Sequence, residues 1–227
     1  MNNEPGEWEW SPLPPDIPVE TPEVLKKALE AQQYLSELKG ISQTIPNQKI
    51  LLNTLPIQEA RDSSEIENIV TTSDDLYKAD VEKEKKIDQT TKEVQRYTLA
   101  LNEGFDRIKR DDLIRVNDII AIQQRLEDND AGIRSLPGTK LSNPATGEVV
   151  FVPPQHKEVI LKALDNLVQY INDDDLSDVH PIIKMAIIHV QFESIHPFYD
   201  GNGRTGRIIN MLYLVQKGLL DIPVLYL

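Results

Sequence analysis

The chain of 227 residues contains no cysteine. Disulfides, thiolate metal ligands and cysteine nucleophiles are therefore excluded, and the composition suits a reducing compartment without requiring one. Histidine is also scarce, with only four residues, which argues against a histidine-rich metal cluster. Any metal is better sought at carboxylates than at imidazoles or thiolates.

Basic residues are few relative to acidic ones. Lys and Arg number 24 against 37 Asp and Glu, a formal net charge of −13. This balance argues against a large nucleic-acid surface, so we expect no nucleic acid partner for this region. It does not exclude binding of ATP, because the electric field of one pocket is local.

Long hydrophobic runs are missing too. No uncharged stretch of 18 apolar residues occurs, and the chain does not open with a signal peptide. We therefore expect a cytoplasmic protein without a membrane partner. The apolar fraction of 40% is enough for a packed core, and the length allows one or two domains.

The most informative segment is HPFYDGNGRTGR at 196–207. Its glycines let successive N–H groups turn toward an anion, and a helix beginning after them adds its positive end. Arg204 and Arg207 are suited to bidentate contacts with phosphate. Asp200 is a hard oxygen ligand for Mg²⁺, and His196 titrates near neutral pH. The segment therefore predicts a polyphosphate site beside a proton acceptor.

A dinucleotide-binding interpretation competes with this one. Gly201, Gly203 and Gly206 satisfy G-x-G-x-x-G, and Asp221 follows at about the expected spacing. That fingerprint must follow a β-strand in a βαβ unit. The preceding run 182–192 is long and indicates a buried helix instead, so we reject this interpretation.

The segment resembles, without a departure, the signature of the Fic-domain family, His-Pro-Phe-x-Asp/Glu-Gly-Asn-Gly-Arg-x-x-Arg. The resemblance implies transfer of AMP from ATP to a hydroxyl side chain of a target protein. It implies that His196 is the catalytic base and that Asp200 binds Mg²⁺. The residues implied to bind the nucleotide are Gly201, Asn202, Gly203, Arg204, Thr205, Gly206 and Arg207, with the first three cradling the α- and β-phosphates, Arg204 on the β-phosphate and Arg207 on the γ-phosphate.

Three further residues refine this picture. Family members that act as kinases carry Lys at the second motif glycine, so Gly203 favours transfer of AMP. Gln191, near the end of the preceding helix, is expected to border the nucleotide. His189 is expected to be a buried, hydrogen-bonded structural histidine.

A second motif, Ser63-x-x-x-Glu67-Asn68, lies upstream. It resembles the inhibitory motif of the family, Ser/Thr-x-x-x-Glu-Gly/Asn, which implies that Glu67 pairs with Arg207 and withholds it from the γ-phosphate. Ser64 and Glu67 also fit a capping box at a helix start, so both interpretations stay open at this stage.

The predicted fold is all-α, a Fic-like helical bundle with one small β-hairpin flap. We assign 1–50 to an N-terminal arm and helix, and 51–227 to the Fic domain. Pro56 is expected to interrupt a helix, so that the inhibitory helix covers about 57–70. Turn residues and β-prone residues at 131–152 predict the hairpin. In the family, such a flap aligns the segment of the target that presents the Ser, Thr or Tyr hydroxyl.

The apolar end of the chain at 224–227 predicts a C-terminal extension beyond this sequence. The sequence also leaves a homodimer open. Three alternative functions stay open. The first is Fic-type transfer of another group, namely UMP, phosphocholine or phosphate. The second is a nucleotide-binding regulatory module, and the third is a toxin-like component of a cognate pair.

Overall fold

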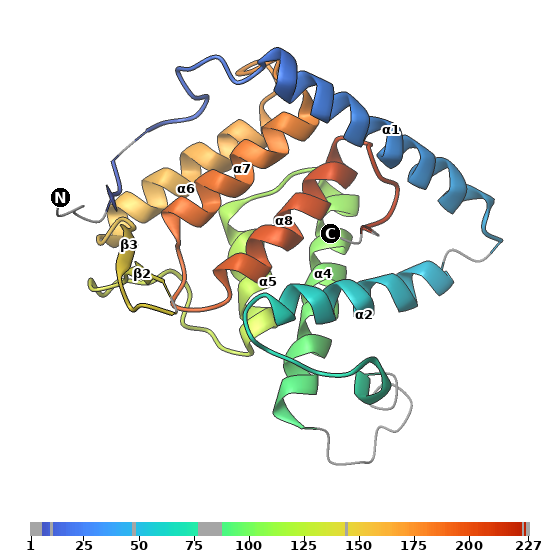
Figure 1. The fold of residues 1–227 in the computed structure, drawn as a ribbon, viewed down its shortest axis with the longest axis horizontal. Helices are drawn as coiled ribbons and strands as arrows, with labels where there is room; N and C mark the ends of the chain where they lie inside the picture. The colour runs from blue at the N-terminus through green and yellow to red at the C-terminus, as the bar shows by residue number, and fades with distance from the viewer. Residues whose placement is uncertain are drawn as a thin grey trace.

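The computed structural model describes residues 6–9, 11–46, 49–76, 88–143, 145–223 and 225. Within them the fold is all-α with one small sheet, as predicted (Figure 1). The helices are α1 (Pro22–Thr44), α2 (Lys49–Glu65), α4 (Gln89–Asp111), α5 (Val116–Glu127), α6 (Lys157–Asn172), α7 (Pro181–Ile195) and α8 (Asn202–Gln216).

Helix α8 lies at the centre of the molecule. It contacts α7, α4, α5 and α2, and Figure 1 shows it crossing in front of the green α4 and α5. Its middle is buried on every side, with Met211, Leu212 and Tyr213 at most 1% exposed. Gly104 of α4 permits the close approach, because a Cβ there would lie 2.6 Å from the Leu212 side chain. The helix that follows the glycine-rich segment is therefore held by core packing.

The sheet has three short strands in the order β1-β3-β2. β2 (Leu141–Ser142) and β3 (Val149–Val152) form the predicted antiparallel hairpin, whereas β1 (Gly6–Glu7) adds a parallel strand that the sequence analysis did not anticipate. The N-terminal arm is fixed further along, where Leu13 exchanges two hydrogen bonds with the Asn166 side chain. The arm thus closes one edge of the flap.

The predicted break at Pro56 and the helix at about 57–70 are both wrong. α2 runs through Pro56 and ends at Glu65, because its packing against α4 compensates for the hydrogen bond that proline cannot donate. Ser63 therefore lies in the last turn of α2, and Glu67 lies in the turn that follows it. The capping-box interpretation fails as well, because Ser64 is close to the end of a helix and not at its start.

The described helices include none that is both long enough and apolar enough to span a membrane.

Candidate active site

The glycine-rich segment forms the link between α7 and α8. His196 ends α7 in the left-handed conformation, with φ 46°, and its N–H donates to the Phe192 carbonyl at 3.0 Å. Gly201, with φ 76°, begins α8. Between them the Asn202 side chain accepts from the Phe198 N–H at 2.9 Å and donates to the Phe198 carbonyl at 3.0 Å. Asn202 therefore shapes the loop with its side chain, and only its main-chain N–H is left to serve as part of a phosphate cradle.

The first turn of α8 presents the positive end of a helix next to Asp200. Main-chain N–H groups in a first turn lack intrahelical partners, which favours an anion there. The Asp200 carboxylate is exposed and accepts from the Gly201 N–H at 2.7 Å. Among the described residues no cluster of three or more potential ligands forms a metal site. A single carboxylate still suits Mg²⁺, which binds proteins through one or two carboxylates together with substrate phosphates.

His196 is partly buried, and its Nδ1 has no hydrogen-bond partner among the described residues. Burial lowers the pKa of its imidazole, and the positive charge of Arg134 lowers it further. His196 is therefore neutral at physiological pH, which is the state that accepts a proton.

Arg204, in the first turn of α8, is only 3% exposed. Its Nη2 donates to Oε1 of Glu127, at the end of α5, at 2.8 Å. Its Nε and Nη1 have no partner in the described part of the chain. The adjacent Thr205 is completely buried, so its hydroxyl does not line an open site.

Arg207 lies one turn further along and contacts the end of α2. Its Nε donates to the Ser63 hydroxyl at 2.6 Å and its Nη2 to the Ser63 carbonyl at 2.7 Å. Nη2 also lies 3.0 Å from Oε1 of Glu67. The turn closes through Asn68, which has φ 62°. The same Glu67 carboxylate lies against Gly203, where an added Cβ would collide with it.

Gln191 does not join these residues, contrary to the prediction. It lies two positions from His189 on α7, and its side chain donates to the Ser11 carbonyl of the N-terminal arm at 3.2 Å. The periodicity of α7 explains this, because residues two positions apart point to opposite faces. His189, predicted to be structural, lies 3.2 Å from the Asn210 amide.

Glu193 was missed by the sequence analysis, although it lies three residues before His196 on the same helix face. Its Oε1 is buried without a described hydrogen-bond partner, and an added Cβ at Gly206 would lie 2.7 Å from it. Burial raises the pKa of this carboxyl to about 7, and the charge of Arg207 opposes the shift. Helical spacing from the histidine was the signal that would have revealed it.

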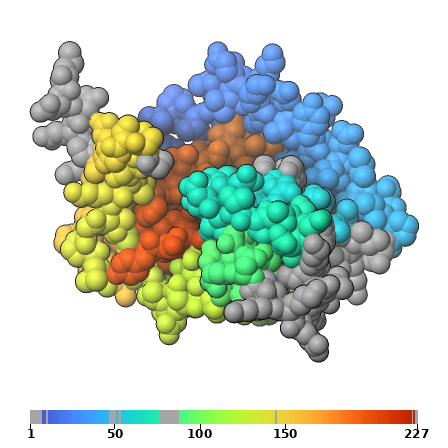
Figure 2. Space-filling model, turned by 60° about the horizontal axis from the view of Figure 1, so that its bottom comes forward, coloured from blue at the N-terminus to red at the C-terminus, as the bar shows by residue number. Residues whose placement is uncertain are grey.

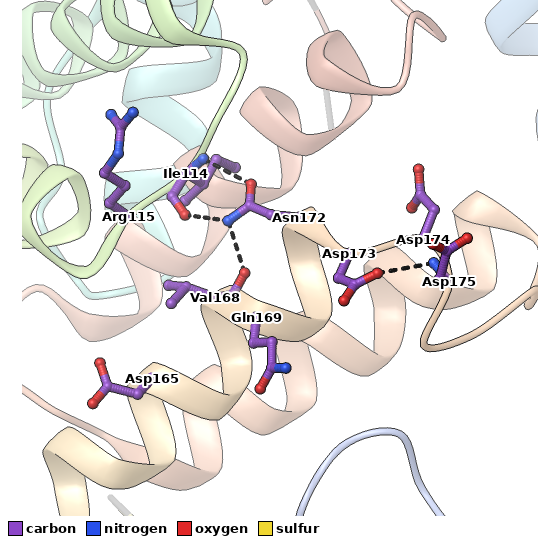
Figure 3. Close-up of a pocket in the computed structure, with 9 residues that line it drawn as sticks. All are labelled: Ile114, Arg115, Asp165, Val168, Gln169, Asn172, Asp173, Asp174 and Asp175. Atoms are coloured by element: carbon purple, nitrogen blue, oxygen red, sulfur yellow. Dashed lines mark hydrogen bonds between the residues drawn. The ribbon is translucent and has the colours of Figure 1, made fainter.

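The signature segment reaches the surface of the molecule. In Figure 2 the orange-red signature segment is exposed between the teal end of α2 and the yellow flap. A separate cleft of about 610 Å³ lies beside the end of α6 (Figure 3) and shares no residue with the signature. There the Asn172 side chain bonds both main-chain groups of Ile114 and the Val168 carbonyl, so its polar groups are already used.

Comparisons with known proteins agree with the signature. The family model for the Fic/DOC N-terminal region matches residues 25–106, and the model for the Fic/DOC family matches residues 107–214. The chain therefore belongs to the Fic/DOC family.

Curated relatives match over part of their length. A protein adenylyltransferase, fic-1 of Caenorhabditis elegans, is 28% identical over 48% of this chain and 21% of its own length. A probable protein adenylyltransferase of Aquifex aeolicus is 40% identical over 31% of this chain and 21% of its own. The matched region thus spans about a fifth of these relatives.

Solved structures share the fold. A fragment of Fic-1 from C. elegans superposes with a TM-score of 0.69 at 21% identity, covering 90% of this chain and 60% of that one. A Fic family protein from Desulfovibrio desulfuricans gives 0.67 at 21% identity, covering 87% and 59%.

Proposed function

We propose that the chain is a protein adenylyltransferase, which transfers AMP from ATP to a hydroxyl side chain of a target protein. The observation that carries this proposal is the short loop joining the neutral imidazole of His196 to the start of α8, where Arg204 and Arg207 occupy the first and second turns. A proton acceptor and a triphosphate-binding helix end are thereby held together. The names of the curated relatives support the same activity.

In the proposed reaction the target hydroxyl attacks the α-phosphorus of ATP. The new O–P bond forms as the bond to pyrophosphate breaks, and the hydroxyl proton passes to His196. A positioned base of this kind contributes about 10²–10⁴-fold to the rate. The N–H groups at the start of α8 and the Arg204 guanidinium stabilise the negative charge on the phosphates.

Mg²⁺ fits this site through Asp200. When bound, it would neutralise part of the charge of the phosphates and orient them. Within the chain, Gly201 holds the Asp200 carboxylate through its N–H, which fixes the side chain at the edge of the loop.

We further propose that the chain inhibits itself through Glu67. The three polar contacts between Arg207 and the segment 63–67 occupy the guanidinium that would otherwise bind the γ-phosphate. The Glu67 carboxylate also lies over Gly203, in the first turn of α8. ATP bound under these conditions would have its α-phosphate poorly aligned for attack. Because both groups belong to one chain, inhibition would be intramolecular.

The flap offers an edge for the target. β3 is paired on both sides, with β1 and with β2. A target segment would therefore extend the sheet at an outer edge, that of β1 or that of β2, through main-chain hydrogen bonds. Such pairing reads backbone more than side chains, so specificity for one target would come from other contacts.

The test uses ATP labelled at the α-phosphate, Mg²⁺ and cell lysate. Glu67→Gly should label itself and lysate proteins more strongly than the wild type, and Glu67→Gly with His196→Ala should bind ATP but transfer no label. Equal labelling with and without His196 would refute the role of the base.

Mass spectrometry of the modified protein identifies the group, because UMP, phosphocholine or phosphate would each add a different mass from AMP. A Glu67→Gly protein that binds ATP and never transfers label would instead indicate a nucleotide-binding regulatory module.

A further inference from the structure

Arg134 is an arginine with none of its surface exposed, located in the loop between α5 and the flap. Charged side chains are rarely buried completely unless their charge or hydrogen-bond donors are used. Its pKa is lowered by burial, so the fold keeps this cation in place against an electrostatic penalty. Its contacts indicate why.

Among the described residues, the Arg134 side chain donates its hydrogen bonds to main-chain carbonyls at the end of α7, at His196 and just after β3. Nε donates to the His196 carbonyl at 2.7 Å, and Nη2 donates to the Ile195 carbonyl at 3.4 Å and to the Pro154 carbonyl. The Arg134 main-chain N–H donates to the Pro197 carbonyl at 3.0 Å. One residue thus joins the end of α7, the turn at His196 and the residues that follow β3.

These bonds satisfy carbonyls that a helix end would leave without partners. They also hold His196 in the left-handed region, which a residue with a Cβ seldom adopts. A planar guanidinium can bond several carbonyls at fixed angles, which a lysine ammonium cannot reproduce. The direction in which the His196 ring projects therefore depends on this fork.

The loop that carries Arg134 has a second link to the signature. The N–H groups of Ser135 and Leu136 both donate to the Tyr199 hydroxyl, at 3.0 and 3.2 Å. Gln155 then closes the base of the flap, accepting from the Gly138 N–H at 2.6 Å and donating to the Thr139 carbonyl at 3.0 Å. The base of the flap and the signature loop are consequently connected as one unit.

We propose that Arg134 is a positioning residue for the base of the reaction. It fixes the main chain of His196 and connects the imidazole to the flap that would hold the target. This inference rests on the proposed adenylyl transfer. In it, Arg134 acts on the reaction through His196 and not by contact with the substrate.

The charges around His196 make the proposal measurable. Arg134 is the positive group that lowers the pKa of the imidazole beyond the effect of burial. The Glu193 carbonyl and the Glu67 and Asp200 carboxylates act in the opposite direction and raise it. Removing the guanidinium takes away its positive charge while burial and the acceptor groups stay, so the pKa of His196 should rise.

The experiment compares Arg134→Met and Arg134→Lys, both in the Glu67→Gly background. NMR titration of the His196 ring should give a higher pKa in Arg134→Met, because a nearby positive charge is lost. Arg134→Lys keeps the charge and should leave the pKa close to its original value. With labelled ATP, kcat should fall at least about tenfold in Arg134→Met and less in Arg134→Lys, with KM for ATP unchanged in both.

Lys184→Met is the matched control. Lys184 is also a buried cation, with 2% of its surface exposed, and it lies near the start of α7, the helix that ends at His196. This substitution should lower stability and leave the His196 pKa and kcat unaltered. An unshifted pKa in Arg134→Met, with a loss of kcat no larger than in Lys184→Met, would overturn the proposal. Should Arg134→Met fail to fold, Arg134→Lys decides, since full kcat without the fork contradicts a positioning role. The NMR readout needs no adenylyl transfer, so failure of the proposed function would be recognised separately.

Discussion

Arg204 and Arg207 lie one turn apart on α8, and each is paired with a glutamate from another part of the chain. The Arg204–Glu127 distance is 2.8 Å, with side chains 3% and 14% exposed. The Arg207–Glu67 distance is 3.0 Å, with side chains 13% and 40% exposed. The two pairs are alike in length and differ in how much water reaches them.

This difference separates a fixed ion pair from a releasable one. A buried pair cannot lose one partner without leaving a desolvated charge, whereas water and salt replace the partner of an exposed pair at little cost. Glu127 ends α5, which packs in the core, and Glu67 lies in a turn after α2. We infer that the Glu127–Arg204 pair persists in the folded protein, and that the Glu67–Arg207 pair can dissociate.

The largest effect expected is on the buried pair. Glu127→Ala should lower the free energy of unfolding by about 3–5 kcal/mol, because Arg204 is left as an uncompensated buried charge. Urea unfolding measures this loss.

Asp128→Asn is the control for that experiment, because the neighbouring Asp128 forms a pair of the same 2.8 Å length with Arg96 but is 69% exposed. It should change stability little. A loss in Glu127→Ala no larger than in Asp128→Asn would remove the distinction between the two kinds of pair.

Glu193 gives the next largest effect, and it acts on the Arg207 side of the comparison. Its pKa is about 7 in the folded protein, above the value of roughly 4.3 of a free glutamate. Between these two pH values the folded state keeps a proton that the unfolded state has lost. Stability should therefore fall as pH rises from about 4.3 to about 7, by a total on the order of 3–4 kcal/mol, and stay level above that.

Glu193→Gln removes this titration. Urea unfolding at pH 5 and pH 7.5 should show a smaller difference in the variant than in the wild type. Glu37→Gln, on the exposed face of α1, should retain the wild-type difference. An equal pH dependence in the wild type and Glu193→Gln would show that the buried carboxyl is not the group responsible.

The two pairs also mark how far the sequence could predict this site. His196, Asp200 and the two arginines form one contiguous motif, so local pattern was enough to find them. The contact between Glu67 and Arg207 spans 140 positions, and only the resemblance of a second motif pointed to it. Glu127 and Arg134 belong to no motif, and only tertiary packing brings them to the signature.

The errors in the predicted fold also come from tertiary packing, which local sequence does not show. Proline locally disfavours the middle of a helix, yet α2 continues through Pro56 because it packs on α4. β1 has only two residues, and its parallel pairing with β3 depends on the path of the arm over α6. The apolar run 182–192 was correctly interpreted as a buried helix, because it is too long for a strand, and it lies within α7.

The smallest effect on stability is expected from the exposed pair. Glu67→Gln should change the free energy of unfolding by less than about 1 kcal/mol, because the carboxylate is 40% exposed and water replaces it. The same change removes the negative charge beside Arg207, which keeps its two hydrogen bonds to Ser63, so the affinity for a non-hydrolysable ATP analogue with Mg²⁺ should rise about tenfold, or about 1.4 kcal/mol. Isothermal titration calorimetry measures this gain, with Glu65→Gln as a control in the exposed end of α2. A large loss of stability in Glu67→Gln without a gain in affinity would make its pair with Arg207 a structural contact, and the two arginines would then no longer differ in role.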